Sequence, residues 1–174
     1  MGKKTDNPEL NSLTDEDWEQ LKSQEGIVVV DVYAKWAGPC TLMRPVILKV
    51  KAKLQISDQH EDIIQYATAC SDSVTELECF KNICTPTFLF MAGGSLVAFM
   101  HGADGGKMRE MIYAEVKSEM EVVAGNRERA GLAMEEAVPA QYEETEEEAD
   151  IGTKTVKNMN MLKKSLMVGA MLKN

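Results

Sequence analysis

Apolar and polar positions alternate along the chain in stretches that predict both strands and helices. The most apolar stretch, 27–34, is too continuous for a half-exposed strand, so we expect a central strand covered on both faces. Asp31 is the one acid inside it. Gly93 and Gly94 separate two further apolar runs, which is typical of a β-hairpin. The predicted strands are 27–34, 63–69, 88–91 and 96–100.

Apolar residues at spacings of three and four predict helices between these strands. Thr14 before three acids is typical of a helix start, and Pro45 is expected to kink the helix after the central strand. The polar stretch 126–137 is expected to extend the last helix or to fray from it. The order of elements predicts an α/β fold with a parallel part and a hairpin at one edge. The predicted helices are 14–24, 42–54, 71 or 73 to 80, and 106–123.

Charge sets the C-terminal part of the chain apart. Residues 135–150 hold eight acids and no base, which predicts a solvated acidic linker over 138–153. Residues 151–174 hold five lysines and no acid, and we expect a basic amphipathic segment over 154–174. Its apolar face is expected to bind a partner protein through Met159, Leu162 and Leu166.

The overall charge narrows the classes of ligand. A net charge of −9 and a pI of about 4.8 argue against a surface that binds nucleic acid by neutralising phosphates. No apolar run approaches the length of a spanning helix, and the N-terminal tail, 1–10, leads into no apolar signal region. We therefore expect a soluble intracellular protein with protein partners, without membrane attachment and without a cofactor.

The most informative motif is Trp-Ala-Gly-Pro-Cys at 36–40, between the central strand and the next helix. It resembles the thioredoxin signature Trp-Cys-Gly-Pro-Cys, and Asp31, Pro45, Thr85-Pro86-Thr87 and Gly102 occur at matching order and spacing. These matches identify the chain as similar to the thioredoxin family over about residues 10 to 120.

The resemblance implies a fold and a domain organisation. It implies a thioredoxin fold over 11–118, with a mixed central sheet and helices on both faces. After this domain the sequence pattern predicts a helical extension over 119–137. It also implies that the peptide bond before Pro86 is cis, an arrangement that is rare outside such conserved positions.

The motif departs from the family at its first cysteine. In thioredoxins that cysteine is the attacking thiolate and the second cysteine resolves the mixed disulfide. Here Ala37 stands in the first position, and Cys40 matches the resolving thiol, which in the family lies deeper below the protein surface. A thiol with an ordinary pKa is only about 3% thiolate at pH 7 and is therefore a poor nucleophile. Asp31 matches the family's buried proton-transfer carboxylate, but Thr68 stands where a lysine commonly accompanies it. We expect that disulfide reductase activity is lost and that the chain is not an enzyme.

The family's substrate groove is expected to persist as a binding surface. An extended polypeptide can pair with backbone groups there without a thiol. The residues expected to bind a partner in it are Trp36, Gly38, Pro39, Thr85, Pro86 and Gly102.

The remaining cysteines leave one alternative open. Cys70 and Cys79 are expected to be buried. Cys84 lies two residues before Pro86, and the resemblance implies that it is exposed, as a cysteine at this place is in some animal thioredoxins. The alternative function is therefore a single-thiol redox protein that forms mixed disulfides through Cys40 or Cys84. A metal site is not expected, because the two histidines lack ligand spacing.

A narrower resemblance comes from the second half of the domain. The stretch 85–98 in the hairpin, His-Gly-Ala-Asp at 101–104, and Gly-Asn-Arg-Glu-Arg at 125–129 are similar to thioredoxin domains of ciliary proteins. These are the thioredoxin–nucleoside diphosphate kinase fusions and the thioredoxin-type light chains of axonemal outer-arm dynein. A stand-alone light chain is expected, because the chain is too short for an added kinase domain. The resemblance implies dynein intermediate or heavy chains, or another axonemal subunit, as partners, and a place in the axoneme of cilia or flagella with a cytoplasmic pool before assembly.

Overall fold

The computed structural model describes residues 10–12, 14–58 and 63–140. The chain divides into two units, Met1–Pro139 and Ala140–Asn174, and the description below concerns the first. The predicted basic segment and nearly all of the predicted acidic linker lie outside the described residues. Among those that are described, no helix is both long and apolar enough to cross a bilayer.

A five-stranded mixed sheet forms the centre of the first unit. Its strands lie in the order β1-β3-β2-β4-β5, with β1, β3 and β2 parallel and β4 and β5 antiparallel to their neighbours. The predicted strands, the parallel part and the hairpin are confirmed, and the short edge strand β1 was not predicted. The strands are β1 (Leu10–Ser12), β2 (Ile27–Tyr33), β3 (Ile64–Cys70), β4 (Thr87–Ala92) and β5 (Ser95–His101).

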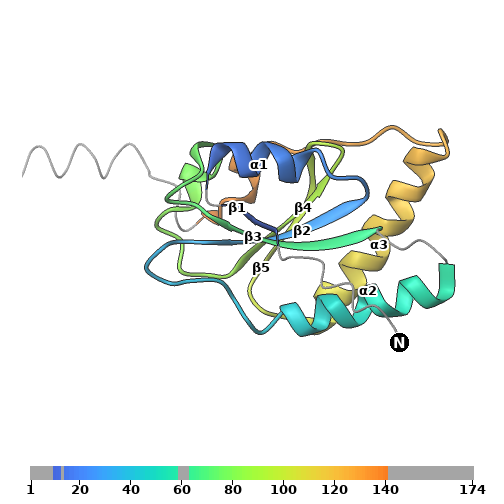
Figure 1. Cartoon of the computed structure of the whole chain (residues 1–174), viewed down its shortest axis with the longest axis horizontal. Coiled ribbons are helices and arrows are strands. Elements are labelled where there is room, and N and C mark those ends of the chain that lie inside the picture. Colours follow the sequence, from blue (N-terminus) through green and yellow to red (C-terminus); the bar gives the residue numbers. More distant parts are fainter. Residues whose placement is uncertain (1–9, 13, 59–62, 141–174) are drawn as a thin grey trace, which may run out of the picture. The chain divides into compact units, whose positions relative to one another are not determined.

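Helices cover both faces of this sheet. Figure 1 shows α1 on one side and both α2 and α3 on the other. Thr14 caps α1, because its hydroxyl oxygen accepts a hydrogen bond from the Asp17 N–H at 3.1 Å. The helices are α1 (Asp15–Lys22), α2 (Arg44–Asp58) and α3 (Gly105–Val123), with 3₁₀ turns η1 (Thr75–Phe80) and η2 (Met134–Ala137).

The two faces of β2 pack into separate parts of the core. Ile27 and Val29 join a cluster with apolar residues of α2 and α3, whereas Val28 and Val30, which are also buried, point to the opposite face. Asp31 shares the face of Val29, at the end of β2 that leads to α2. Strand alternation therefore places this carboxyl group on the side of the sheet that α2 covers.

Two expectations for α2 are wrong. The pattern assigned Leu42 to the apolar side of the helix, but α2 begins only at Arg44, and Leu42 is 69% exposed in the preceding loop. Pro45 therefore lies in the first turn and does not kink the helix. The N–H groups of a first turn have no acceptor inside the helix, so proline is tolerated there, and the backbone ladder starts with Ile47 N–H bonded to the Met43 carbonyl oxygen at 3.0 Å.

The predicted helical extension is wrong beyond Val123. Gly125 takes a left-handed conformation, with φ of +73°, and the Asn126 N–H turns back to the Glu121 carbonyl oxygen at 2.9 Å. This is a Schellman-type end that stops α3. Residues 126–137, here called the C-terminal strap, instead run back across the hairpin, where the Leu132 N–H bonds the Leu96 carbonyl oxygen at 2.8 Å.

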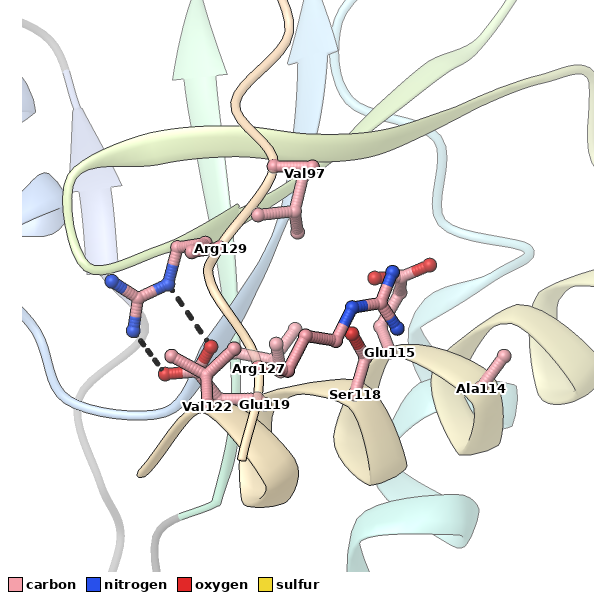
Figure 2. A pocket seen from close by; sticks show the side chains of 10 residues that line it. Val97, Ala114, Glu115, Ser118, Glu119, Val122, Arg127 and Arg129 are labelled. Carbon is pink, nitrogen blue, oxygen red and sulfur yellow. Dashed lines mark hydrogen bonds and ion pairs between the residues drawn. The ribbon is translucent and has the colours of Figure 1, made fainter. Parts of the chain in front are cut away.

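An ion pair fastens the strap to α3. Figure 2 shows the Arg129 guanidinium forked on the carboxylate of Glu119, which is buried on α3; the Nε–Oε2 distance is 3.1 Å. The guanidinium also lies against Gly93 in the hairpin turn, where a Cβ atom would come within 2.4 Å of it. The strap ends with Ala137 fully buried. It is therefore an integral part of the folded unit.

Candidate functional site

The candidate site begins in the loop between β2 and α2. The N–H groups of Ala37 and Gly38 both bond the Ala34 carbonyl oxygen, at 2.9 and 3.0 Å, and Gly38 has a φ of +72°. Asp72 holds the start of the loop by accepting the Lys35 N–H at 2.7 Å. In this tight turn the side chain of Trp36 is 67% exposed. The loop therefore presents an aromatic ring to solvent.

Asp31 anchors the other end of the same loop. Its Oδ2 atom accepts the backbone N–H of Cys40 at 2.6 Å and the hydroxyl of Tyr66 at 3.3 Å. The side chain is buried, with 1% of its surface exposed, and its Oδ1 atom has no hydrogen-bond partner among the described residues. The carboxyl group that the resemblance assigns to proton transfer thus ties the loop to the sheet.

Burial changes the protonation of this anchor. Removal from water raises the pKa of Asp31 to about 6, although the hydrogen bonds from Cys40 and Tyr66 oppose the shift. Thr68 is the direct neighbour of Asp31 on β3, at the register position where the expected lysine is missing. Threonine carries no charge, so this position supplies no cation that would hold the Asp31 carboxylate ionised.

A second segment of the expected groove lies at the same edge of the sheet. Antiparallel pairing sets Thr87 beside Val32, so Thr85 and Pro86, just before β4, lie at the edge where β2 ends. The Pro86 carbonyl oxygen accepts the Gly102 N–H at 2.8 Å, which joins the segments before β4 and after β5.

The expected cis bond before Pro86 is wrong. None of the peptide bonds among the described residues is cis, so the Thr85–Pro86 bond is trans. The trans form is the intrinsic preference of an X–Pro bond, by about 0.5–1 kcal/mol. The partner-binding residues Trp36, Gly38, Pro39, Thr85, Pro86 and Gly102 all have some solvent exposure, whereas Met159, Leu162 and Leu166 lie outside the described residues.

The cysteines differ in accessibility. Cys40 is half-buried, Cys70 is buried and Cys84 is exposed. Cys79 is also exposed, which contradicts the expectation of burial, because the short 3₁₀ turn that carries it buries only Leu77 and Phe80. Partial desolvation and the nearby Glu135 carboxylate raise the pKa of the Cys79 thiol. In the described part of the chain none of the four cysteines forms a disulfide, and no cluster of three metal-ligating side chains is present.

Sequence reasoning missed the polar residues that hold the loop. Tyr66 and Asp72 reach it from β3 and from the turn after β3, and neither belongs to the motif. The hollow in Figure 2, of about 220 Å³, was also unforeseen; it lies between Val97, the end of α3 and the strap. Its lining carries four charged side chains. Glu119 pairs with Arg129, and burial raises the pKa of the Glu115 carboxyl although the nearby Arg127 charge opposes the shift.

Comparison with known proteins places these features in a family. The family model described as Thioredoxin matches residues 9–118. The chain belongs to the thioredoxin family. Among its relatives, thioredoxin domain-containing protein 6 of Homo sapiens is 36% identical over 121 residues, which are 70% of this chain and 35% of that protein. The Xenopus laevis protein of the same name is 38% identical over 114 residues, 66% of this chain and 17% of that protein.

The two relatives just named are much longer than this chain, which spans about a third or less of each. A solved thioredoxin from Plasmodium falciparum has 24% identity and a TM-score of 0.45, over 60% of this chain and 96% of that protein. The family match covers the sheet, α1, α2, the loop that aligns with the family's active site, and α3 as far as Ser118, so it ends before the strap.

Proposed function

We propose that this chain is a redox-inactive thioredoxin-like adaptor, a subunit of a ciliary axonemal complex with outer-arm dynein as the candidate assembly. The observation that carries the first part is Ala37, which stands where the family has its attacking cysteine. A methyl group cannot form the mixed disulfide with which reduction begins. Disulfide reduction by the family mechanism is therefore lost at its first step.

The surroundings of Cys40 support the same conclusion. Its thiol is half-buried, its own N–H is committed to Asp31, and the position that would hold a second sulfur is an alanine. A resolving thiol without an attacking thiol cannot complete a dithiol cycle. What remains is a shaped loop beside the segment that contains Pro86.

The exposed parts of this loop favour binding of protein. Trp36 is a large aromatic side chain that contributes little to the core, and such residues often supply much of the binding energy at interfaces. The groove of Trp36, Gly38, Pro39, Thr85, Pro86 and Gly102 is the proposed site for an extended partner segment. Met159, Leu162 and Leu166 in the basic C-terminal segment are proposed to make a second contact within the same assembly, linked to the first through the acidic residues.

The axonemal assignment rests on the resemblance of the hairpin and strap sequences to ciliary thioredoxin-like light chains. Dynein intermediate or heavy chains, or another axonemal subunit, are the proposed partners. The proposed location is the axoneme of a cilium or flagellum, with a cytoplasmic pool before assembly.

Retention of tagged variants in isolated axonemes tests the adaptor role. Trp36→Ala should reduce the fraction retained after a moderate salt wash, with an unchanged melting temperature, because the ring lies outside the core. Tyr113→Ala, which removes a 44% exposed aromatic from α3, is the matched control and should be retained normally. Equal retention of the two variants would contradict a binding role for the loop.

The alternative, a single-thiol redox protein, is favoured only by the exposure of Cys84. If mixed disulfides join the chain to its partners, Cys84→Ser or Cys40→Ser should abolish retention and remove the reducible adducts on non-reducing gels. The adaptor proposal instead expects normal retention of both variants.

A further inference from the structure

Positive charge is concentrated in one stretch of an otherwise acidic protein. Residues 32–57 contain five bases, Lys35, Arg44, Lys49, Lys51 and Lys53, and no acid. Residues 1–150 as a whole contain 14 bases and 28 acids, so the rest of that region has 9 bases and 28 acids, a net charge of −19. The positive stretch covers the remnant active-site loop and nearly all of α2.

The fold directs this charge outward. Ile47, Val50 and Leu54 bury one side of α2 against the core. Lys49 is exposed on the opposite side, and Lys51 is half-exposed at the flank. Lys35 is exposed at the start of the loop, next to Trp36.

Large apolar side chains lie between these lysines. Trp36, Leu42 and Leu48 are 67%, 69% and 40% exposed. Leu42 precedes α2 by two residues and Leu48 lies in its second turn, so both are near the N-terminal end of the helix. We call Lys35, Trp36, Leu42, Leu48, Lys49 and Lys51 the basic apolar face.

Neighbouring elements do not share this charge. α3, which packs beside α2, carries Lys107, Arg109 and Lys117 together with Glu110, Glu115, Glu119 and Glu121, a net charge of −1. The acidic first turn of α1 lies on the other side of the sheet (Figure 1). Asp72, whose carboxylate accepts the Lys35 N–H at 2.7 Å, adds one acid at the loop end of the basic apolar face. The attraction for an anionic ligand is therefore strongest over Lys49 and Lys51.

We propose that the basic apolar face binds an acidic polypeptide segment that carries large apolar side chains. The proposal rests on the proposed function, because it takes the loop as part of a binding surface, and it specifies the chemistry of the partner. Complementary charge would orient the segment, and its apolar residues would cover Trp36, Leu42 and Leu48. A long polyanion such as RNA fits less well, since the acidic remainder of the surface repels it. An anionic membrane meets the same repulsion.

Fluorescence polarisation with the full chain tests this proposal. The probe is a fluorescein-labelled 12-residue peptide in which glutamate alternates with leucine and tryptophan. Reversing two charges with Lys49→Glu/Lys51→Glu should raise the Kd about tenfold at low salt, and Lys49→Ala/Lys51→Ala should raise it by a smaller factor. The control, Lys107→Glu/Lys117→Glu on α3, makes the same change in net charge and should alter the Kd less than about twofold.

Other probes decide between classes of ligand. A peptide with serine at each apolar position should bind several-fold more weakly. A peptide with lysine in place of each glutamate should not bind. Equal Kd values for the α2 and α3 charge reversals would overturn the proposal. So would equally tight binding of an oligouridine of the same charge, or of phosphatidylserine vesicles, because the face would then be a general anion surface.

The proposed function can fail separately. If Trp36→Ala lowers axonemal retention but the α2 charge reversal does not change peptide binding, the adaptor role stands and the acidic partner is wrong. If the α2 reversal weakens peptide binding but Trp36→Ala is retained as well as Tyr113→Ala, the adaptor role is wrong.

Discussion

The buried anchor Asp31 leads to a stability prediction that depends on pH. In the folded chain its pKa is raised to about 6, chiefly by burial, whereas an unfolded chain releases this proton near pH 3.8. The folded state therefore holds the proton between these two values while the unfolded state does not. As pH rises through this window the folded state becomes less stable relative to the unfolded state, and above about pH 6 the full penalty is present.

The magnitude follows from the size of the shift. About two pKa units correspond to about 3 kcal/mol at neutral pH, to within about 1.4 kcal/mol. Asp31→Asn removes the titration and keeps a side-chain oxygen that can accept the Cys40 N–H. The new amide hydrogens lack assured acceptors, which costs about 1–3 kcal/mol at any pH. The net change at pH 8 is thus small or stabilising.

The comparison of two pH values isolates the titration. We expect the effect of Asp31→Asn on the free energy of unfolding, measured by urea denaturation, to be more favourable at pH 8 than at pH 4.5 by about 2 kcal/mol. The cost of the amide cancels in this difference. An effect of equal size at both pH values would refute the reasoning, as would a variant that is relatively more stable in acid.

Three further changes test other parts of the structure. Arg129→Met should lower the free energy of unfolding by about 2 kcal/mol, because it leaves the buried Glu119 carboxylate without its partner, and adding Glu119→Leu to this variant should restore most of the loss. A loss below about 0.5 kcal/mol would show that the pair does not hold the strap. Gly93→Ala should cost about 1–2 kcal/mol in thermal or urea unfolding, since Gly93 has φ of +51° and a methyl group there displaces Arg129; unchanged stability would count against that packing. Glu135→Gln should speed alkylation of Cys79 about twofold at pH 8, as measured by mass spectrometry, because it removes a carboxylate that raises the pKa of the thiol. An unchanged rate would show that the carboxylate does not influence the thiol.

Patterns of short range predicted most of the sheet. The β-branched run of β2 and the paired glycines of the hairpin carry their own structural preference, and both were located from sequence. β1 was not predicted, because three residues are too few to show a strand period and because its pairing with β3 depends on residues far along the chain. The start of α2 was misplaced because Leu42 and Met43 continue an apolar spacing that the backbone does not follow.

The strap and the loop anchors show why other features were not predictable. Residues 126–137 look like a polar extension of α3. Tertiary contacts, namely the Arg129–Glu119 ion pair and the bond from the Leu132 N–H to the Leu96 carbonyl oxygen, show that they fold back. The motif and its spacing to Asp31 identify Asp31 and Cys40 as site residues. Tyr66, which donates a hydrogen bond to Asp31, comes from another strand, 35 positions along the chain. Such partners are set by tertiary packing, which spacing in the sequence does not encode.

The central claim, that the chain lacks disulfide reductase activity, is most directly tested by insulin reduction. Purified full-length protein is mixed with insulin and dithiothreitol, and precipitation of the reduced insulin B chain is followed by turbidity against a thiol-free control protein. We predict that the unmodified chain matches the control, and that Ala37→Cys gains activity, because Asp31, Pro39 and Cys40 are already in place. Precipitation by the unmodified chain at a rate clearly above the control would contradict the account.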